Sequence, residues 1–320
     1  MVLAVLIFII SAIGIYFSGE LVVKNIIRFS HILGVSVFVI SFFLMGVASA
    51  MPNLFLGISS ALKNISELSL GDVFGNNFLN LTLVISLAIL FSESKKIEIQ
   101  SSLIRESFVF MTLSALAPLF LAADGIISRY DGLFLLVLFV FYLWWSFSRR
   151  DYVYEEVYKK TISIEKILKE WEGYKAILKI IFGLIILFLS AQGIIFSSKY
   201  FANYLNLPLI IVGIFIVGFG NALPETYFAF SSAKKGETQM IFGNMIGAVI
   251  TPATFVLGIV SLISPIYIEN FLFLEINRLI YILVILFLLW FVEKNKELNL
   301  KNALILILIY IIFFGITFLI

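Results

Sequence analysis

The stretch GVASAMPNLFLGISSALKNISELSLGDVFGNNFLNLTLV (residues 46–84) has a diverged second copy later in this chain of 320 residues. The copy is GFGNALPETYFAFSSAKKGETQMIFGNMIGAVITPATFV (residues 218–256), which aligns at an offset of 172 residues without a gap. Eleven of the 39 aligned positions are identical, including Pro52/Pro224, Gly71/Gly243 and Gly75/Gly247. Shared hydrophobicity alone would not reproduce these helix breakers, so the stretch indicates an internal duplication.

Outside these windows the chain is equally apolar. Hydrophobic residues make up 62% of the sequence and charged residues only 13%, more apolar surface than a water-soluble core could hide. Ten runs approach the roughly 20 residues with which a helix crosses a bilayer core about 30 Å thick. The fold class predicted is all-α, a polytopic membrane protein with ten transmembrane helices, approximately at 2–18, 34–61, 70–91, 103–122, 132–148, 175–196, 206–233, 241–265, 270–292 and 302–319.

The duplicated window begins in the second run and again in the seventh, five crossings later. An odd number of crossings turns the second copy upside down in the membrane, which is the inverted-topology repeat of many secondary transporters. We therefore expect two five-helix repeat halves, residues 1–148 and 175–320, joined by a linker at 149–174.

The linker is the one substantial polar segment of the sequence. Ile164, Ile167, Leu168 and Trp171 fall at helical spacing within it, which favours an amphipathic helix on the inner surface of the membrane. A solvated linker without helical structure is the alternative.

Lysine and arginine are distributed unevenly between the predicted loops. With an outside N-terminus, all but four of the 22 basic residues lie inside, the exceptions being Lys63, Arg129, Lys199 and Arg278. The positive-inside rule therefore predicts a multi-pass protein of the cell membrane with both termini outside and the 149–174 linker inside.

Composition also excludes several function classes. The chain has no cysteine and a single histidine, His31, so thiolate and histidine-cluster metal sites are excluded within one chain. The net charge of +2 is too small to argue for nucleic acid. Without a phosphate-binding glycine loop or a nucleophile with its base, we expect neither an enzyme nor a bound cofactor, and no protein partner is implied.

Each copy of the repeat carries a proline among small and polar residues inside an apolar run. Because proline has no N–H, Pro52 and Pro224 would free the carbonyls of Ala48 and Gly220, four residues earlier. A free carbonyl at membrane depth is tolerated where it lines an enclosed cavity, and a cation is a natural ligand for it. A simple kink is the alternative for either proline taken alone.

Acidic and amide side chains cluster beside these prolines. Glu225 is the only acidic residue well inside an apolar run, with Asn221 one turn earlier, and a carboxylate at that depth is a functional-site hypothesis by default. Asp72, Asn76 and Asn80 recur every four residues, so they share a helix face. An N-cap is the alternative role for Asp72. Oxygen donors of these kinds suit hard cations such as sodium and calcium.

At this point the chain resembles the calcium/cation antiporter superfamily, and in layout the prokaryotic sodium/calcium exchangers. That family has ten helices with two inverted alpha-repeats, each containing a G-T-S-x-P-E element and a G-N-x-x-G-S-N element. Here the first element stands as ASAMPN (48–53) and GNALPE (220–225), and the second as GDVFGNN (71–77) and GNMIGAV (243–249).

Departures from the family pattern fall on its ligand positions. The first-repeat glutamate is Asn53, and later ligand positions have become Ala248 and Pro252. Because the family relies on two facing glutamates, the missing one is expected to weaken binding of divalent relative to monovalent cations. The cation ligands that the resemblance and the residues together imply are Glu225, Asn53, Ser49, Asn76, Asn80, Asn221 and Asp72, with the main-chain oxygens of Ala48 and Gly220.

The function expected from these observations is secondary active antiport of inorganic cations, with sodium, calcium or protons transported by alternating access at a mid-membrane site. The alternative is a divergent relative whose eroded site serves as an uncoupled channel or in a structural or regulatory role. Protons and metal are expected to compete at Glu225.

Cysteine labelling tests the predicted topology, because the natural chain contains no cysteine. Ile65→Cys and Lys160→Cys are expected to react with a membrane-impermeant maleimide from opposite sides of the membrane. Labelling of both positions from the same side would contradict the inverted-repeat prediction.

Overall fold

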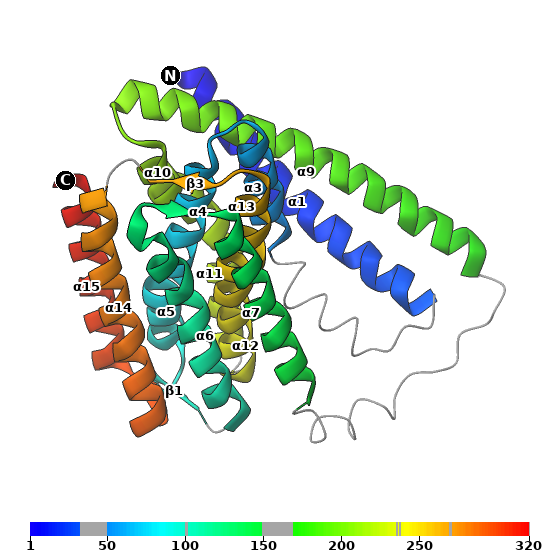
Figure 1. Ribbon diagram of the computed structural model, residues 1–320. Helices are drawn as coiled ribbons and strands as arrows, with labels where there is room; N and C mark the ends of the chain where they lie inside the picture. Colours follow the sequence, from blue (N-terminus) through cyan, green and yellow to red (C-terminus); the bar gives the residue numbers. More distant parts are fainter. Residues whose placement is uncertain are drawn as a thin grey trace.

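The computed structural model describes residues 1–32, 50–99, 102–148, 169–234, 236, 238–268 and 271–319, most of them in helices gathered into a bundle (Figure 1). The α-helices are α1 (Val2–Ile32), α3 (Met51–Leu62), α4 (Ser66–Leu79), α5 (Ile85–Phe91), α6 (Ser102–Leu121), α7 (Arg129–Ser148), α9 (Lys169–Leu205), α10 (Leu209–Val212), α11 (Gly218–Lys234), α12 (Thr238–Thr251), α13 (Leu257–Ile263), α14 (Phe271–Lys294) and α15 (Leu300–Leu319). Between them lie π-helical turns η2 (Asn80–Val84), η5 (Gly213–Val217) and η6 (Pro252–Val256), a 3-10 turn η3 (Ala122–Asp124), and strands β1 (Lys96–Glu98), β2 (Ile126–Ile127), β3 (Ile266–Tyr267) and β4 (Glu297–Asn299).

Eight helical segments in this part of the chain are long and apolar enough to cross a membrane. The pair Leu209–Leu223 and Glu225–Lys234 adds a ninth if it is taken as one span bent by 47°. The predicted second span falls partly on residues 33–49, which lie outside the described ranges, and its described part, α3, has only 12 residues. The mostly helical, multi-span fold is confirmed, and the count of ten spans stays a prediction.

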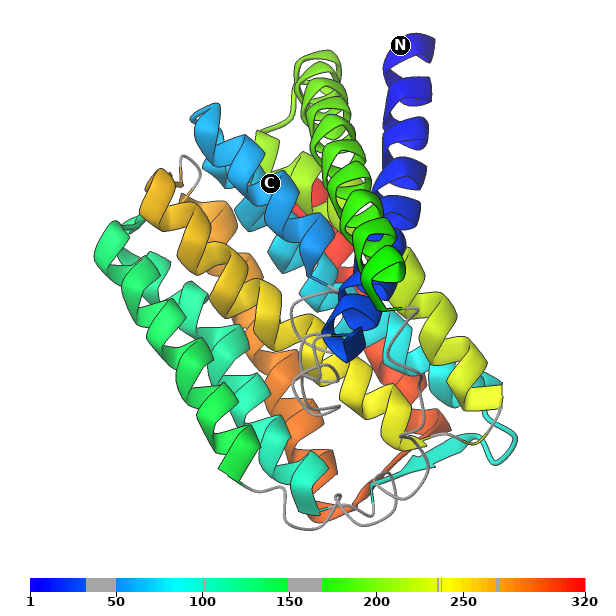
Figure 2. The ribbon, with the colours of Figure 1, turned by 90° about the vertical axis from the view of Figure 1, so that its right-hand side faces the viewer.

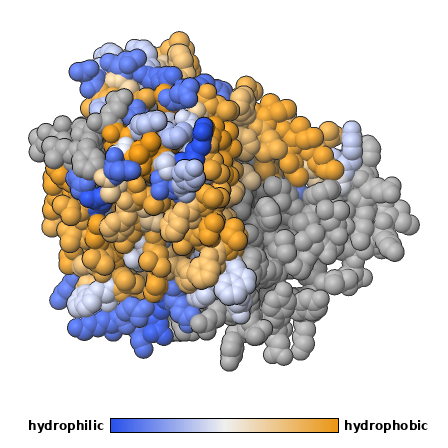
Figure 3. All heavy atoms as spheres, viewed as in Figure 1, coloured by the Kyte–Doolittle hydropathy of each residue, from blue (hydrophilic) through white to orange (hydrophobic). Residues whose placement is uncertain are grey.

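The outer surface of the bundle is that of a protein surrounded by lipid. Large apolar side chains such as Leu133, Trp144 and Leu286 are exposed along the helices. Figure 3 shows this apolar zone on one face, with hydrophilic residues gathered above and below it. Burial of such residues in the hydrocarbon core requires no partner protein, because lipid tails are as apolar as the side chains.

Helices α1 and α9 are longer than the predicted spans 2–18 and 175–196. They have 31 and 37 residues, and at 1.5 Å per residue each exceeds a bilayer core of about 30 Å. Both run obliquely to the other helices and alongside each other (Figures 1 and 2). α9 begins at Lys169, so the last residues of the predicted 149–174 linker are helical, while 149–168 lie outside the described residues.

Small residues let α1 and α9 pack closely. A Cβ added to Gly14 would overlap Ser190, and one added to Gly193 would overlap Ser11. The Ser197 hydroxyl donates a hydrogen bond to the Ala4 carbonyl at 2.9 Å. Close backbone approach of this kind, with hydroxyl groups bonded across the interface, is typical of helix pairs in membranes.

The third and eighth predicted spans have the same construction. α4, η2 and α5 begin at residues 66, 80 and 85, and α12, η6 and α13 begin 172 residues later at 238, 252 and 257. In both, a threonine of the π turn bonds back to a carbonyl: Thr82 to Phe78 at 2.5 Å and Thr254 to Ile250 at 2.6 Å. Pro252 cannot bond the Ala248 carbonyl, and the π turn η6 begins at this residue.

Two short strand pairs connect the first part of the chain to the last. β1 pairs with β4 in antiparallel register, and β2 pairs with β3. Figure 1 shows β1 and β3 at opposite ends of the bundle, as expected because α6 crosses it between β1 and β2. At the β1 end, Lys96 lies 2.6 Å from Glu98 and 3.6 Å from Glu297, and Glu98 raises the pKa of the Lys96 ammonium.

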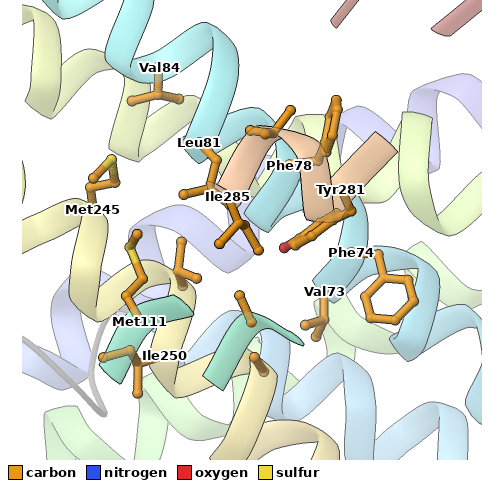
Figure 4. Packing of buried hydrophobic residues seen from close by; sticks show 14 of the residues in the cluster. Val73, Phe74, Phe78, Leu81, Val84, Met111, Met245, Ile250, Tyr281 and Ile285 are labelled. Atoms are coloured by element: carbon orange, nitrogen blue, oxygen red, sulfur yellow. The ribbon is translucent and has the colours of Figure 1, made fainter. Parts of the chain in front are cut away.

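The buried core lies between the central helices and α14 and α15. Phe78 of α4 is fully buried and stacks on Phe313 of α15, with ring centroids 4.0 Å apart. Tyr281 of α14 lies beside Phe74 and Phe78, as Figure 4 shows. α4 is therefore enclosed on all sides, and any polar group on it is removed from lipid and water.

Glycines allow the main chain of α4 to touch the main chain of α10 and η5. A Cβ at Gly71 would overlap the Ile210 carbonyl, and a Cβ at Gly75 would overlap the Ile214 carbonyl. On the facing helix, a Cβ at Gly213 would lie 2.9 Å from the Asp72 nitrogen and one at Gly218 would lie 2.8 Å from the Asn76 nitrogen. These contacts fix how closely α4 approaches α10 and η5 and where along their lengths they cross.

Gly75→Ala is expected to destabilise the protein by about 1–3 kcal/mol or more, because the new methyl group meets rigid backbone and forces the helices apart. Thermal unfolding of the purified protein in detergent, followed by monodispersity, measures the effect. Gly315→Ala is the matched control, since a Cβ at Gly315 meets nothing within 4 Å. Equal melting temperatures for the two variants would show that the crossing does not hold the bundle together.

Candidate functional site

Asp72 lies inside α4 and is fully buried. α4 begins at Ser66, with Ile65 at the capping position, so the N-cap interpretation of Asp72 is wrong. The glycine before Asp72 serves the helix crossing and does not interrupt the helix. A carboxylate in such surroundings needs compensation by hydrogen bonds or by an opposite charge.

One oxygen of Asp72 is bonded across the crossing. The side-chain amide of Asn221, on α11, donates to Asp72 Oδ1 at 2.8 Å. Asp72 Oδ2 has no hydrogen-bond partner among the described residues. The contact joins residues 149 positions apart, and it brings together two of the predicted ligands.

Glu225 lies one turn after Asn221 on α11, next to the bend at Pro224. Only 8% of its surface is exposed, and its Oε2 has no partner among the described residues. Asn221 joins the two acidic residues, since it lies one turn before Glu225 and donates its hydrogen bond to Asp72. A bound cation or a proton would compensate the buried negative charge of either carboxylate.

Asn76 and Asn80 continue the Asp72 face of α4 into the π turn η2. Both side chains are buried, and the Asn80 amide donates to the Asn76 carbonyl at 3.0 Å and to Asn76 Oδ1 at 3.2 Å. Asn80 Oδ1 has no partner within the described ranges. The Asn80 amide nitrogen is thus occupied within the pair, and its own amide oxygen remains available as an acceptor.

The remaining predicted ligands are placed unevenly. Asn53 lies in the first turn of α3 and is buried, with its Nδ2 unpartnered among the described residues. Gly220 precedes Asn221 on the bent helix, half-buried, so its carbonyl lies on the segment that carries the two site side chains. Ala48 and Ser49 lie outside the described residues, and their contribution stays a prediction.

Asn77 is a buried polar residue that was not among the predicted ligands, although it belongs to the same glycine-containing element. Asn77 Nδ2 donates to the Val249 carbonyl at 3.2 Å, and Val249 is the residue that aligns with Asn77 at the 172-residue offset. α4 therefore meets α12 at equivalent positions. The sequence signal that could have identified Asn77 is a polar residue within an apolar run, next to Asn76 in the same element.

The structure thus joins Asp72 of α4 to Asn221 of α11, one turn before Glu225, and the grouping of Asn53, Asn76 and Asn80 with them in one site stays a prediction. No group of three histidine, cysteine or acidic side chains suited to a metal occurs among the residues that the structure describes. A cation here would depend on mixed carboxylate, amide and main-chain oxygens, the donor types preferred by hard cations.

Comparison with known proteins decides the family. The family model described as "Sodium/calcium exchanger protein" matches residues 3–148 and 175–319, nearly the whole chain. The chain belongs to the sodium/calcium exchanger family. The two matched segments have nearly the same bounds as the predicted halves, 1–148 and 175–320. The family is one of transporters.

Individual relatives are distant but cover most of the chain. It is 25% identical to the inner membrane protein YrbG of Escherichia coli over 83% of the chain and 81% of that protein. It is 24% identical to the sodium/calcium exchanger MaX1 of Methanosarcina acetivorans, over 97% and 98% respectively.

Solved structures share the fold. A structure of the sodium-calcium exchanger NCX_Mj soaked with Na+ and Sr2+ is 23% identical, with a TM-score of 0.62 over 98% of each chain. The H+/Ca2+ exchanger CAX is 15% identical, with a TM-score of 0.75 over 97% of this chain and 81% of that one. Together with the apolar surface, these likenesses make this exchanger-family chain a multi-pass membrane protein.

Proposed function

We propose that this protein is a secondary active cation antiporter that works by alternating access at a mid-membrane site. The observation that carries the proposal is the contact between Asp72 and Asn221, one turn from Glu225. Both carboxylates are buried, and each has an oxygen that has no partner in the described residues. An ion gradient is the energy source that fits such a site.

Electrostatics gives the reason why this site would bind ions. Two buried carboxylates repel each other, and removing a charge from water is unfavourable by several kcal/mol even in a relaxed protein interior. A bound cation or proton relieves both effects. Sodium, calcium or protons are the proposed transported ions, because the ligands are hard oxygens and the sequence relatives and structural neighbours named above include sodium/calcium and H+/Ca2+ exchangers.

Inverted repeats supply the mechanism of alternating access in this proposal. Three features support them. α4–α5 and α12–α13 share their construction at a constant offset. Asn77 bonds the main chain of its aligned residue. β1 and β2 of the first half pair with β4 and β3 of the second, at opposite ends of the bundle. Ten spans, outside termini and an inside linker complete the proposed topology.

A second candidate is an uncoupled channel or a structural relative in which the ion site has been lost. It is favoured by the residues at three family ligand positions, which are Asn53, Ala248 and Pro252. Ala248 offers no side-chain oxygen, and Pro252 begins the π turn η6. This candidate predicts cation movement without exchange, or none.

Counterflow distinguishes the two candidates. Proteoliposomes are loaded in turn with sodium, potassium, calcium or magnesium salts, or given a proton gradient, and uptake of labelled sodium or calcium is followed. An antiporter takes up label only when an exchangeable ion is present on the other side. Equal uptake without such an ion would indicate a channel, and no uptake under any gradient would contradict transport.

Glu225→Gln is expected to reduce coupled uptake to the background of protein-free vesicles while the protein remains folded. The neutral amide is close in shape to the carboxylate and is easier to bury, so the fold should be retained. Glu93→Gln removes the same charge from an exposed position beyond α5 and serves as the control. A monodisperse Glu225→Gln protein that transports at the wild-type rate would remove Glu225 from the mechanism.

A further inference from the structure

The two halves of the chain distribute carboxylate and amide differently at aligned positions. Asn53 of α3 aligns with Glu225 of α11, and Asp72 of α4 aligns with Asn244 of α12. Each half thus has one carboxylate and one amide. In the first half the carboxylate lies on α4 and the amide on α3, whereas in the second half the carboxylate lies on α11 and the amide on α12. The four positions therefore hold two carboxylates. A chain with glutamate at both position 53 of α3 and position 225 of α11, and amides at the other two positions, would have the same number.

The position of Asp72 makes it a member of the site and not a separate buried acid. Its carboxylate is fully buried and accepts a hydrogen bond from Asn221 on the helix of Glu225. Asn221 lies one helical turn before Glu225 on α11. α4 also packs against α3, the helix that carries Asn53. α4 therefore contacts both α3, which has Asn53 in place of a carboxylate, and α11, which carries Glu225.

The unpartnered atoms of the two carboxylates indicate a ligand. Asp72 Oδ2 and Glu225 Oε2 are buried acceptor oxygens without a hydrogen-bond partner in the described part of the chain. Native proteins rarely leave buried polar atoms unsatisfied, and an ion is one of the common explanations. Two carboxylate oxygens of this kind suit a cation.

We propose that Asp72 takes the place of the carboxylate that the first half lacks at Asn53, so that the site presents two negative charges to a divalent cation. Asn221 is the positioning residue, because its amide holds Asp72 Oδ1 and leaves Oδ2 for the ion. The inference rests on the proposed antiport site. It replaces the expectation that Asn53 weakens divalent binding, since a charge moved to a neighbouring helix still attracts the ion.

Calcium binding to the purified full chain in detergent tests the inference by isothermal titration calorimetry. Asp72→Asn is expected to weaken calcium affinity by about tenfold or more, because affinity for calcium follows the number of charged ligands. The introduced amide can still accept the Asn221 hydrogen bond, so the fold should be retained. The double variant Asn53→Glu/Asp72→Asn, which returns the charge to α3, is expected to recover most of the lost affinity.

Glu93→Gln, at an exposed position, is the matched control and should bind calcium like the wild type. The inference is overturned if the wild type binds no calcium, if Asp72→Asn binds as tightly as the wild type, or if the double variant binds no better than Asp72→Asn. Counterflow of wild-type protein is scored separately, so a protein that binds calcium through Asp72 without exchanging it contradicts only the antiport proposal.

A measurement on unaltered protein covers the case in which the variants fail to fold. Wild-type protein is treated with a hydrophobic carbodiimide with and without calcium, and modified carboxylates are identified by mass spectrometry. Calcium is expected to protect both Asp72 and Glu225, while Glu93 reacts equally in both samples. Protection of Glu225 without protection of Asp72 would overturn the inference.

Discussion

The crossing of α4 with α10 and η5 is the contact on which the rest of the structure depends. At Gly71 and Gly75 the two main chains touch, and no side chain could be accommodated between them. This close approach brings Asn221 within 2.8 Å of Asp72, although the two residues are 149 positions apart. A wider crossing would leave Asp72 without its one observed partner. Packing of small residues therefore determines the electrostatics of the site.

The burial of Asp72 and Glu225 then limits the kinds of ligand that the site can bind. Helix interiors satisfy their own backbone groups, so carboxylates at membrane depth are the groups that remain to be compensated. The site meets this requirement partly with amides, through Asn221 for Asp72 and through the internal bond between Asn80 and Asn76. The oxygens without a partner in the described residues include Asp72 Oδ2 and Glu225 Oε2. Both belong to carboxylates, which attract positively charged ligands.

Sequence predicted the parts of this fold that depend on local chemistry. Apolar runs identify helices because crossing a bilayer imposes a length and a composition, and the repeat located the helix pairs that build the site. The ends of α1 and α9 were missed, since both helices continue beyond their apolar windows. Asp72 was open to interpretation as a cap because Gly71 resembles a helix break, whereas its function is packing. The Asp72–Asn221 contact depends on how two distant helices cross, which no local pattern encodes.

The strand pairs have a consequence for how the two halves are held together. Each pair takes one strand from either half, and the pairs lie at opposite ends of the bundle. Pulling the halves apart would therefore break main-chain hydrogen bonds at both ends of the bundle, in addition to the contacts of α1 with α9 and of α4 with η5.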